Sequence, residues 1–248
     1  MRTLYADGLT ALARVRNRAL PQICFFCGDG ARETVCEPCA GALVRLQSEV
    51  CPRCQLPAGN GEVCGRCLKK PPVWQHLVAE WQYEFPLNSA ITSAKYHHVF
   101  SIFRWVSAQR SGWPFPASAT LIPVPLAALR LQSRGYNPAH LIANEMANRF
   151  ALRVDADAVI RIRETDVQQR LNWIERRRNV RHAFAATRSF AGESVVLVDD
   201  VLTTGSTLNE LAGAVYDAGA ARVDAYVLAR VQPIRRRDRV VKFGRSTT

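Results

Sequence analysis

The stretch that decides the fold is Val195-Val196-Leu197-Val198-Asp199-Asp200-Val201-Leu202-Thr203-Thr204-Gly205-Ser206-Thr207, in the carboxyl-terminal part of a chain of 248 residues. It begins with aliphatic residues, which is the pattern of a short strand buried inside a sheet. Two acids, Asp199 and Asp200, follow directly, and small hydroxylated residues then surround Gly205. A helical pattern begins at Thr207. This order of strand, acids, turn and helix predicts a ligand site at the carboxyl edge of a parallel α/β sheet.

The turn from Thr203 to Thr207 has the composition of an anion-binding site. Backbone N–H groups of a turn that leads into a helix can point at a bound phosphate, and the helix dipole adds partial positive charge. The carboxylates of Asp199 and Asp200 are placed to accept hydrogen bonds from ribose hydroxyls or to hold hydrated Mg²⁺. A ribose 5-phosphate therefore fits the stretch. The residues expected to hold its phosphate are Thr203, Thr204, Gly205, Ser206 and Thr207.

Two other interpretations of this stretch explain less of it. Aliphatic residues followed by paired acids also form the Walker B strand of nucleoside triphosphatases, but the chain has no G-x-x-x-x-G-K-[ST] sequence. A helix start that is merely capped explains a single Ser or Thr. It does not explain a series of hydroxylated residues directly after paired acids.

The segments on either side predict the rest of the domain. Thr120–Val124 and Val223–Ala229 are apolar runs typical of buried strands. Asn137 has the position of an N-cap and Pro138 that of the first helical residue, so we expect a helix from there to Phe150.

A second helix is expected over Thr207–Ala218, with Gly219 at the position of a left-handed C-cap. This helix connects the strand expected at Ser194–Val198 to the strand at Val223–Ala229. A strand, a helix and a strand in this order imply a right-handed crossover and parallel pairing. The predicted fold class is therefore α/β, with a parallel sheet flanked by helices.

All eight cysteines lie before residue 70, in four Cys-x-x-Cys pairs. Such a pair places two thiolates on one side of a tight turn, and two pairs complete a tetrahedral shell around one zinc ion. Clustered thiols on a chain without a recognisable export signal favour metal over disulfides. We therefore expect two structural zinc ions. The expected ligands are Cys24, Cys27, Cys36, Cys39, Cys51, Cys54, Cys64 and Cys67.

The spacing leaves open which pairs share a metal. Sequential pairing closes short loops, whereas interleaved pairing of alternate units is the RING-like arrangement. Gly28 and Gly65 each follow a cysteine, and we predict that they supply the positive φ that a knuckle turn needs. Iron–sulfur ligation is the other possibility, but evenly repeated pairs favour zinc. A segment with so few large aliphatic residues is expected to depend on metal for its fold.

Composition divides the chain into four parts. They are a basic lead at 1–20, a double zinc-knuckle domain at 21–70, an α/β domain at 73–233 and a basic tail at 234–248. Pro71-Pro72 marks the junction between the second and third parts, because successive prolines stop a helix and stiffen a link.

The charge and hydropathy of the chain narrow its partners and location. The net charge of +12 favours anionic partners such as phosphates or nucleic acid. No apolar run approaches the length that a bilayer span requires. Charged residues interrupt the first 20 residues, so a secretory signal is not predicted and a cytoplasmic protein is expected.

The motifs together carry a family resemblance. The stretch from Val195 to Thr207 resembles the motif with which type I phosphoribosyltransferases bind 5-phosphoribosyl 1-diphosphate (PRPP). Upstream motifs in matching order make the chain similar to the ComF family, and its eight-cysteine form resembles the GntX-like members. These upstream motifs are the Cys-x-x-Cys units with Cys51-Pro52-Arg53-Cys54-Gln55-Leu56-Pro57, Lys95-Tyr96, Ile122-Pro123-Val124-Pro125, Arg134-Gly135-Tyr136-Asn137, and Gln168 with Leu171, Arg176, Asn179 and Phe184.

The resemblance implies several roles. Asp199 and Asp200 are expected to contact the ribose hydroxyls, directly or through Mg²⁺. Arg134 resembles a pyrophosphate-side residue of the family, helped by Gly135, which we expect to permit close approach of the chain. Arg176 could lie on a mobile loop that covers the ligand. For Arg130 a solvated surface position is an equal alternative, and the arginine-rich segment around Arg176 could instead be a basic helix that attracts nucleic acid.

Two functions are consistent with these motifs. In the first, the chain is a PRPP- or nucleotide-binding module that takes part in the uptake or use of DNA, a role implied by the ComF resemblance, with single-stranded DNA and DNA-uptake proteins as partners. In the second, it is an active phosphoribosyltransferase that transfers the phosphoribosyl group of PRPP to a nucleobase. A segment that recognises the base would distinguish them, and none is identifiable from the sequence.

Overall fold

A parallel five-stranded sheet is the centre of the molecule, in a computed structural model that describes residues 22–46, 49–97, 100–110, 112–162 and 183–232. The strand order is β3-β9-β8-β4-β5, and every neighbouring pair is parallel. The strands are β3 (Leu77–Gln82), β4 (Thr120–Pro123), β5 (Arg153–Val154), β8 (Ser194–Leu202) and β9 (Arg222–Arg230).

Each face of the sheet is covered by helices because residues alternate between the faces along every strand. On β8, Val196 and Val198 belong to the core that includes α4 (Leu87–His97), α5 (Ser101–Ala108) and α7 (Pro138–Phe150). Val195 and Leu197 belong to the opposite core, which includes α9 (Ser206–Asp217). Both faces of the central strands are thus buried, as expected for a parallel sheet.

Two small elements complete the α/β part. The short helix α6 (Ala128–Arg134) follows β4, and an antiparallel pair of strands is formed by β6 (Val159–Arg161) and β7 (Phe184–Ala186). Phe184 and Val159 join the core on the α9 side of the sheet.

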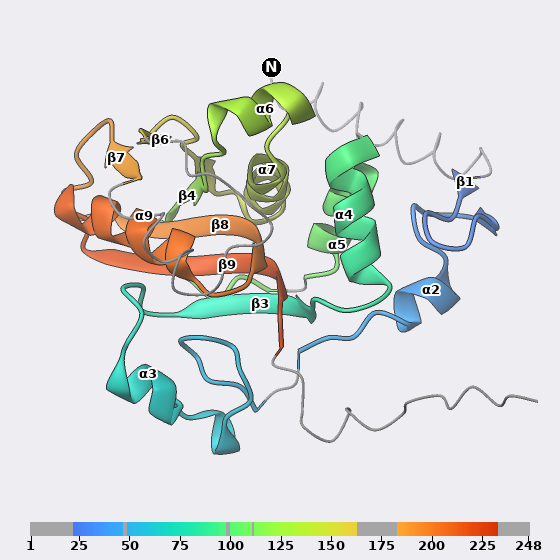
Figure 1. The fold of residues 1–248 in the computed structure, drawn as a ribbon, viewed down its shortest axis with the longest axis horizontal. Coiled ribbons are helices and arrows are strands. Elements are labelled where there is room, and N and C mark those ends of the chain that lie inside the picture. The colour runs from blue at the N-terminus through green and yellow to red at the C-terminus, as the bar shows by residue number, and fades with distance from the viewer. Residues whose placement is uncertain (1–21, 47–48, 98–99, 111, 163–182, 233–248) are drawn as a thin grey trace, which may run out of the picture.

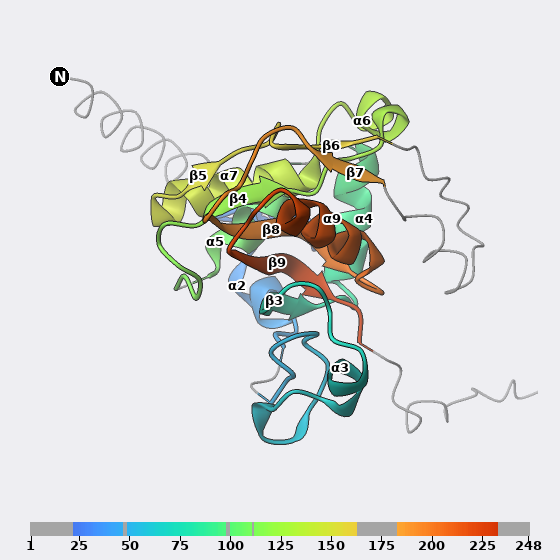
Figure 2. The ribbon, with the colours of Figure 1, turned by 90° about the vertical axis from the view of Figure 1, so that its left-hand side faces the viewer.

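The cysteine-rich part docks on the sheet in two places. Its first section holds β1 (Gln22–Ile23), β2 (Gly30–Ala31) and α2 (Glu37–Gly41), and its buried residues join the core with α4 and α5 (Figure 1). Its second section holds a 3₁₀ turn (Gly59–Gly61) and α3 (Gly65–Lys69). Both views place the section with α3 beyond the β3 edge of the sheet (Figures 1 and 2).

Most of the predicted elements are confirmed. A strand occupies Thr120–Pro123, and α7 begins with Asn137 as its N-cap, whose Oδ1 accepts a hydrogen bond from the Ala139 backbone N–H at 3.0 Å. Gly219 has a φ of +99° after the end of α9. In the part of the chain that the structure describes, no helix is both long and apolar enough to cross a membrane.

Strand β8 is longer than predicted. It was expected to end at Val198, but it continues through both aspartates to Leu202. The reason is that β9 pairs with it over its whole length, with Asp199 opposite Val227 and Leu202 opposite Arg230. A local pattern of aliphatic residues does not report this pairing, because the partner strand lies later in the chain.

Candidate functional site

The two aspartates lie where the sheet opens between β4 and β8. The last paired residue of β4 is Pro123, opposite Val198, and the next backbone N–H, of Val124, donates to the Val198 carbonyl at 2.9 Å. Beyond this point the chain turns away from β8. The order of the strands also reverses here, since β5 follows β4 toward one edge and β9 follows β8 toward the other. Ligands of open α/β sheets bind in such a crevice.

A cavity of about 150 Å³ occupies this crevice. Its lining contains four cationic side chains and two carboxylates, so the surface around the aspartates is positive. These charged residues are Lys95, Arg130, Arg134, Arg161, Asp199 and Asp200. Segment 124–126, the start of α7 and Thr207 complete the lining. A ligand that carries several negative charges suits this composition.

The carboxyl group of Asp199 lies beside a second carboxylate. Burial, and next to it the neighbouring Asp200 carboxylate, raise the pKa of Asp199 to about 7. The backbone N–H of Asp200 donates to the Asp199 Oδ1 at 2.9 Å, which offsets part of this effect. A divalent cation between the carboxylates would relieve the repulsion, so this pair fits Mg²⁺.

Lys95 is a member of this site that the sequence did not assign to it. The residue lies on α4, and its Nζ forms an ion pair with the Asp200 Oδ2. Only 19% of the Lys95 side chain is exposed, and its ammonium group contacts the carboxylate. The available signal was the motif Lys95-Tyr96 in the family resemblance, since helical spacing alone does not show that α4 reaches β8.

Three of the arginines that the structure describes line the cavity beside the aspartates. Arg130 and Arg134 both line the cavity, and the pKa of Arg130 is lowered by burial and by the charge of Arg134. Arg161 lines the cavity as well and was not among the predicted residues. Arg176 lies outside the described residues.

Gly135 shapes the end of α6. A Cβ at this position would meet no protein atom within 4 Å. Its φ of +68° forms the left-handed C-cap of α6, where its N–H donates to the Leu131 carbonyl at 2.7 Å. Gly135 therefore ends the helix that carries Arg130 and Arg134 toward the cavity.

The predicted phosphate-binding residues form a tight turn at the start of α9, here called the phosphate loop (203–207). Gly205 has a φ of +80°, a conformation that residues with a side chain rarely adopt. A Cβ at Gly205 would also lie 2.8 Å from the Cη2 atom of Trp74. Both observations require glycine at this position.

The phosphate loop separates two cavities. Thr207 lines the cavity with the aspartates, whereas Thr204, Gly205 and Ser206 line a second cavity of about 330 Å³. The Thr204 and Ser206 hydroxyls lie 3.0 Å apart, and the Ser206 N–H is within 3.3 Å of the Thr204 Oγ1. Thr203 is exposed. The second cavity is also lined by residues of the cysteine-rich part, among them Arg66 and Lys70.

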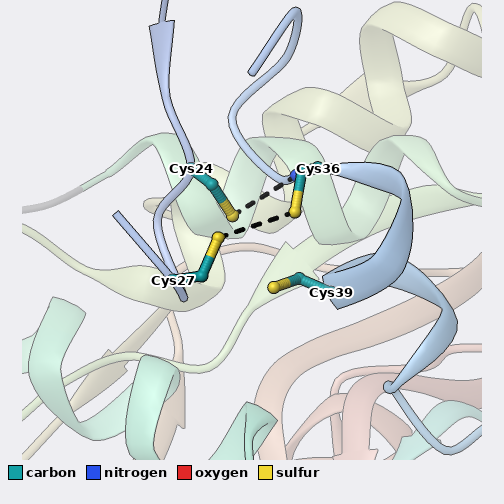
Figure 3. A group of neighbouring side chains, drawn as sticks. All are labelled: Cys24, Cys27, Cys36 and Cys39. Atoms are coloured by element: carbon teal, nitrogen blue, oxygen red, sulfur yellow. Dashed lines mark hydrogen bonds between the residues drawn. The ribbon is translucent and has the colours of Figure 1, made fainter. Parts of the chain in front are cut away.

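The eight cysteines come together as two groups of four, and the pairing is sequential. Cys24, Cys27, Cys36 and Cys39 form the first cysteine site (Figure 3), and Cys51, Cys54, Cys64 and Cys67 form the second; within each group the sulfurs lie within 4.8 Å of one another. The Sγ–Sγ distance is 3.7 Å between Cys27 and Cys36 and again between Cys54 and Cys64. Sulfurs about 2.3 Å from a tetrahedral zinc ion lie about 3.8 Å apart, so both groups fit zinc.

The two sites repeat one backbone arrangement. The N–H of the third cysteine approaches the sulfur of the first, at 3.3 Å from Cys36 to Cys24 and at 3.4 Å from Cys64 to Cys51. After the second cysteine the chain turns with a positive φ, at Gly28 and at Gln55. The prediction for Gly28 is confirmed. The prediction for Gly65 is wrong, because that residue starts α3 and Gln55 takes the left-handed conformation.

The thiols of the first cysteine site have pKa values shifted in opposite directions. Burial raises the pKa of Cys24, but hydrogen bonds from the backbone of Cys27 and Cys36 outweigh it, and the net value falls to about 6. The hydrogen bond with Cys36 raises the pKa of Cys39 to about 12. Four sulfurs at this distance do not all ionise beside one another without a metal ion to compensate their charge.

Comparison with known proteins shows which domain families and which proteins this chain resembles. The phosphoribosyl transferase domain family matches residues 136–246, and the double zinc ribbon domain family matches residues 15–68. The DNA utilization protein YhgH of Salmonella typhi is 34% identical over 223 residues, which cover 85% of this chain and 98% of that protein. Competence protein F of Haemophilus influenzae is 34% identical over 67% of this chain and 78% of its own length. This chain belongs to the ComF family.

Other members and solved structures are more distant. Competence protein ComFC of Bacillus subtilis is 25% identical over 80% of this chain and 85% of its own length. Glutamine PRPP amidotransferase from B. subtilis is 18% identical over 55% of this chain and 26% of its own, with a TM-score of 0.33. A Trypanosoma cruzi hypoxanthine phosphoribosyl transferase is 16% identical over 58% of this chain and 68% of its own, with a TM-score of 0.32. The predicted fold class, a phosphoribosyltransferase-type parallel sheet with a cysteine-rich zinc-binding segment, is confirmed by the family matches and the strand pairing.

Proposed function

We propose that this ComF-family protein binds PRPP, or another ligand that contains ribose 5-phosphate, together with Mg²⁺, and that it takes part in the uptake or use of DNA. The observation that carries the first part is the cavity between β4 and β8. It brings Asp199, Asp200 and Thr207 together with four cationic side chains in one crevice.

Each group of residues has a task in this proposal. Asp199 and Asp200 accept hydrogen bonds from the ribose hydroxyls. The phosphate loop donates backbone N–H groups to the 5-phosphate, and the start of α9 adds its partial positive charge. The positive side chains of Arg130, Arg134 and Lys95 face the diphosphate, whose charge they neutralise. Arg176, outside the described residues, stays a candidate for a covering loop.

The metal ions divide into two kinds. Mg²⁺ would be held by Asp199 and Asp200, where it would neutralise the diphosphate and relieve the repulsion between the two carboxylates. Zinc in the two cysteine sites is structural, because four thiolates fill the shell of each ion and leave no position for a substrate. Thiols that hold zinc must stay reduced, which agrees with a place in the cytoplasm.

The names of relatives and the charge of the chain support the second part. DNA utilization protein YhgH and Competence protein F are members of the same family. The net charge of +12 favours an anionic macromolecule such as single-stranded DNA as a partner. The division into a basic lead at 1–20, a zinc-knuckle domain at 21–70, a phosphoribosyltransferase-like domain at 73–233 and a basic tail at 234–248 remains part of this proposal.

An active phosphoribosyltransferase is the second candidate. The observation that favours it is that the cations lie beside the carboxylates in one cavity, so a leaving pyrophosphate would be neutralised where it forms. Transfer of the phosphoribosyl group to a nucleobase would then need only positioning and charge stabilisation.

A calorimetric titration of the full chain with PRPP and Mg²⁺ tests the proposal. We expect PRPP to bind more tightly than ribose 5-phosphate or pyrophosphate alone, and Asp199→Asn with Asp200→Asn to remove the binding while the fold is retained. Equal affinity in the double variant would refute the ribose assignment. Pyrophosphate release in the presence of a panel of nucleobases then separates an enzyme, which releases it, from a binding module, which does not.

A further inference from the structure

We infer that the second cysteine site holds the phosphate loop in its binding conformation, with Arg230 and Trp74 as the positioning residues between them. The inference deepens the proposed function and rests on it for the identity of the ligand. It says that the metal state of Cys51, Cys54, Cys64 and Cys67 sets the affinity for PRPP, although the cysteines do not touch the ligand.

The first observation is a row of successive carbonyl groups. The turn that contains Cys51 and Cys54 presents four consecutive carbonyls to the α/β part, and each accepts a hydrogen bond from it. The Leu77 N–H donates to Pro52 O at 2.9 Å, the Trp74 Nε1 to Arg53 O at 2.8 Å, the Arg230 Nε to Cys54 O at 2.9 Å and the Gln232 Nε2 to Gln55 O at 3.1 Å. The turn is therefore docked through its backbone, whose shape depends on the sulfurs being held together.

Arg230 continues this contact to the phosphate loop. Its Nη1 donates to the carbonyls of Leu202 at 3.0 Å and Thr203 at 2.7 Å, while its Nε holds Cys54 O. The residue is 5% exposed at the end of β9. A guanidinium is always protonated at neutral pH, so this buried side chain is a cation. One buried cation thus joins the backbone of a zinc ligand to the backbone at the entry of the loop.

Trp74 makes a second connection to the same loop. Its Nε1 is fixed by Arg53 O, and its ring lies so close to Gly205 that a Cβ there would be 2.8 Å from Cη2. The side chain is 3% exposed. Because the ring packs against the one left-handed residue of the loop, a shift of the indole removes the surface that supports this turn.

The first cysteine site docks elsewhere and provides an internal comparison. Cys24, Val35 and Leu43 pack in the core with α4 and α5, and the Trp105 Nε1 of α5 donates to the Glu33 Oε2 at 3.1 Å. The two sites share their backbone geometry but face different parts of the sheet. Loss of metal from one or the other should therefore have different effects on the phosphate loop.

Loss of metal acts on the loop through these contacts. Without a cation nothing bonds the four sulfurs of the second site to one another, and the turn loses its fixed shape. The carbonyls of Arg53 and Cys54 then no longer hold Trp74 and Arg230 in place. The loop becomes free to leave the left-handed turn at Gly205, and a ligand must bear the cost of reordering it.

The experiment compares matched cysteine variants of the full chain. Cys54→Ser with Cys64→Ser disrupts the second site, and Cys27→Ser with Cys36→Ser disrupts the first at the corresponding positions. Zinc content, ligand-free hydrogen exchange of the amides at 203–207 and affinity for PRPP with Mg²⁺ are measured. In the second-site variant we expect the rate of amide exchange at 203–207 and the dissociation constant for PRPP each to rise at least about tenfold. In the first-site variant both quantities should stay within about twofold of those of the unmodified chain. Equal changes in the two variants would overturn the inference.

A further pair of variants decides the question if the second-site variant does not fold. Arg230→Gln removes the link, and Arg222→Gln removes a charged partner from the other end of the same strand, where Arg222 Nε bonds Asp224 Oδ2 at 2.6 Å. Arg230→Gln should keep both zinc ions yet show the faster loop exchange and the weaker PRPP binding, with partial rescue in Arg230→Lys. An Arg230→Gln protein whose loop exchanges like that of Arg222→Gln contradicts the inference.

The exchange measurement needs no ligand, which separates two failures. If the unmodified chain does not bind PRPP, the proposed function fails, while a difference in loop exchange between the two cysteine variants still establishes the coupling. If PRPP binds and loop exchange is the same in all variants, the coupling fails and the proposed function stands.

Discussion

Lys95 of α4 and Asp200 of β8 form an ion pair at the opening of the sheet, with 19% and 12% of their side chains exposed. The ammonium compensates one of two neighbouring carboxylates in the absence of ligand. With Mg²⁺ held by Asp199 and Asp200 in the proposed way, Lys95 would be free to face the diphosphate. The ion pair therefore suits a site whose ligand supplies both a cation for the carboxylates and an anion for the lysine.

The first prediction concerns this ion pair. Lys95→Met should lower the stability of the ligand-free chain by about 1–3 kcal/mol, because Asp200 is left without a partner in a largely buried position. It should also weaken PRPP binding about tenfold or more. Chemical denaturation and calorimetry measure the two effects, with Lys69→Met, at an exposed lysine, as the control. Unchanged affinity in Lys95→Met would remove the lysine from the ligand site.

The second prediction is a dependence of binding on pH. The pKa of Asp199 is raised from 3.8 to about 7, first by burial and then by Asp200. Below about pH 7 the carboxyl group holds a proton that Mg²⁺ must displace, so the affinity for PRPP with Mg²⁺ should fall as the pH is lowered below 7 and level off above it. Titrations between pH 5.5 and 8.5 measure this. Because PRPP itself also takes up protons, the comparison is with Asp199→Asn, in which this contribution should vanish.

The raised pKa of Asp199 also predicts that the stability of the ligand-free chain falls with rising pH, whereas the affinity for PRPP rises. A carboxyl group whose pKa is higher in the folded than in the unfolded chain destabilises the fold once it is ionised, and this penalty grows from about pH 4 to about pH 7. Ligand-free Asp199→Asn should therefore melt at a higher temperature than the unmodified chain at pH 8, by a margin that shrinks toward pH 5. The exposed Asp157→Asn should show no such margin. An Asp199→Asn protein that melts lower at pH 8 would argue against the raised pKa.

The third prediction concerns the turn of the phosphate loop. Gly205→Ala should cost about 2–4 kcal/mol, since it combines a left-handed alanine with a contact of 2.8 Å to Trp74. Gly213→Ala is the matched control, because its Cβ would meet no atom within 4 Å and alanine favours the helix by up to about 1 kcal/mol. Denaturation curves and Trp fluorescence report both. If Gly205→Ala is as stable as Gly213→Ala, the packing of Trp74 against the loop is not as described.

The fourth prediction is that each cysteine site holds one zinc ion independently. Elemental analysis should find two zinc ions per chain, and Cys27→Ser with Cys36→Ser should leave one. Interleaved pairing would place these two cysteines in different sites, and the variant would then lose both ions. Retention of neither ion would therefore contradict the sequential arrangement.

Local patterns predicted much of this molecule. The pairs of cysteines, the N-cap at Asn137 and the glycine turn before α9 all depend on residues close together in the chain, and each of these elements forms as expected. These motifs are informative because the residues that form each of them lie close together in the sequence.

The same local patterns did not predict contacts between segments that are far apart in the sequence. Lys95 of helix α4 reaches Asp200 of strand β8, and Arg230 reaches Cys54 across 176 positions of the chain. Gln55 was missed as a left-handed residue because glycine is the usual signal for that conformation. The extension of β8 through the aspartates depends on β9. In each case the deciding partner lies in a segment whose position follows only from the folded sheet.

The most direct test of the central claim is a crystal structure of the full chain with PRPP and Mn²⁺, whose anomalous signal marks the metal position. The account predicts the metal and the ribose hydroxyls beside Asp199 and Asp200, the 5-phosphate against the N–H groups of 203–207, and the diphosphate toward Arg130 and Arg134. Ligand density at another place on the molecule, with the crevice between β4 and β8 still empty, would contradict it.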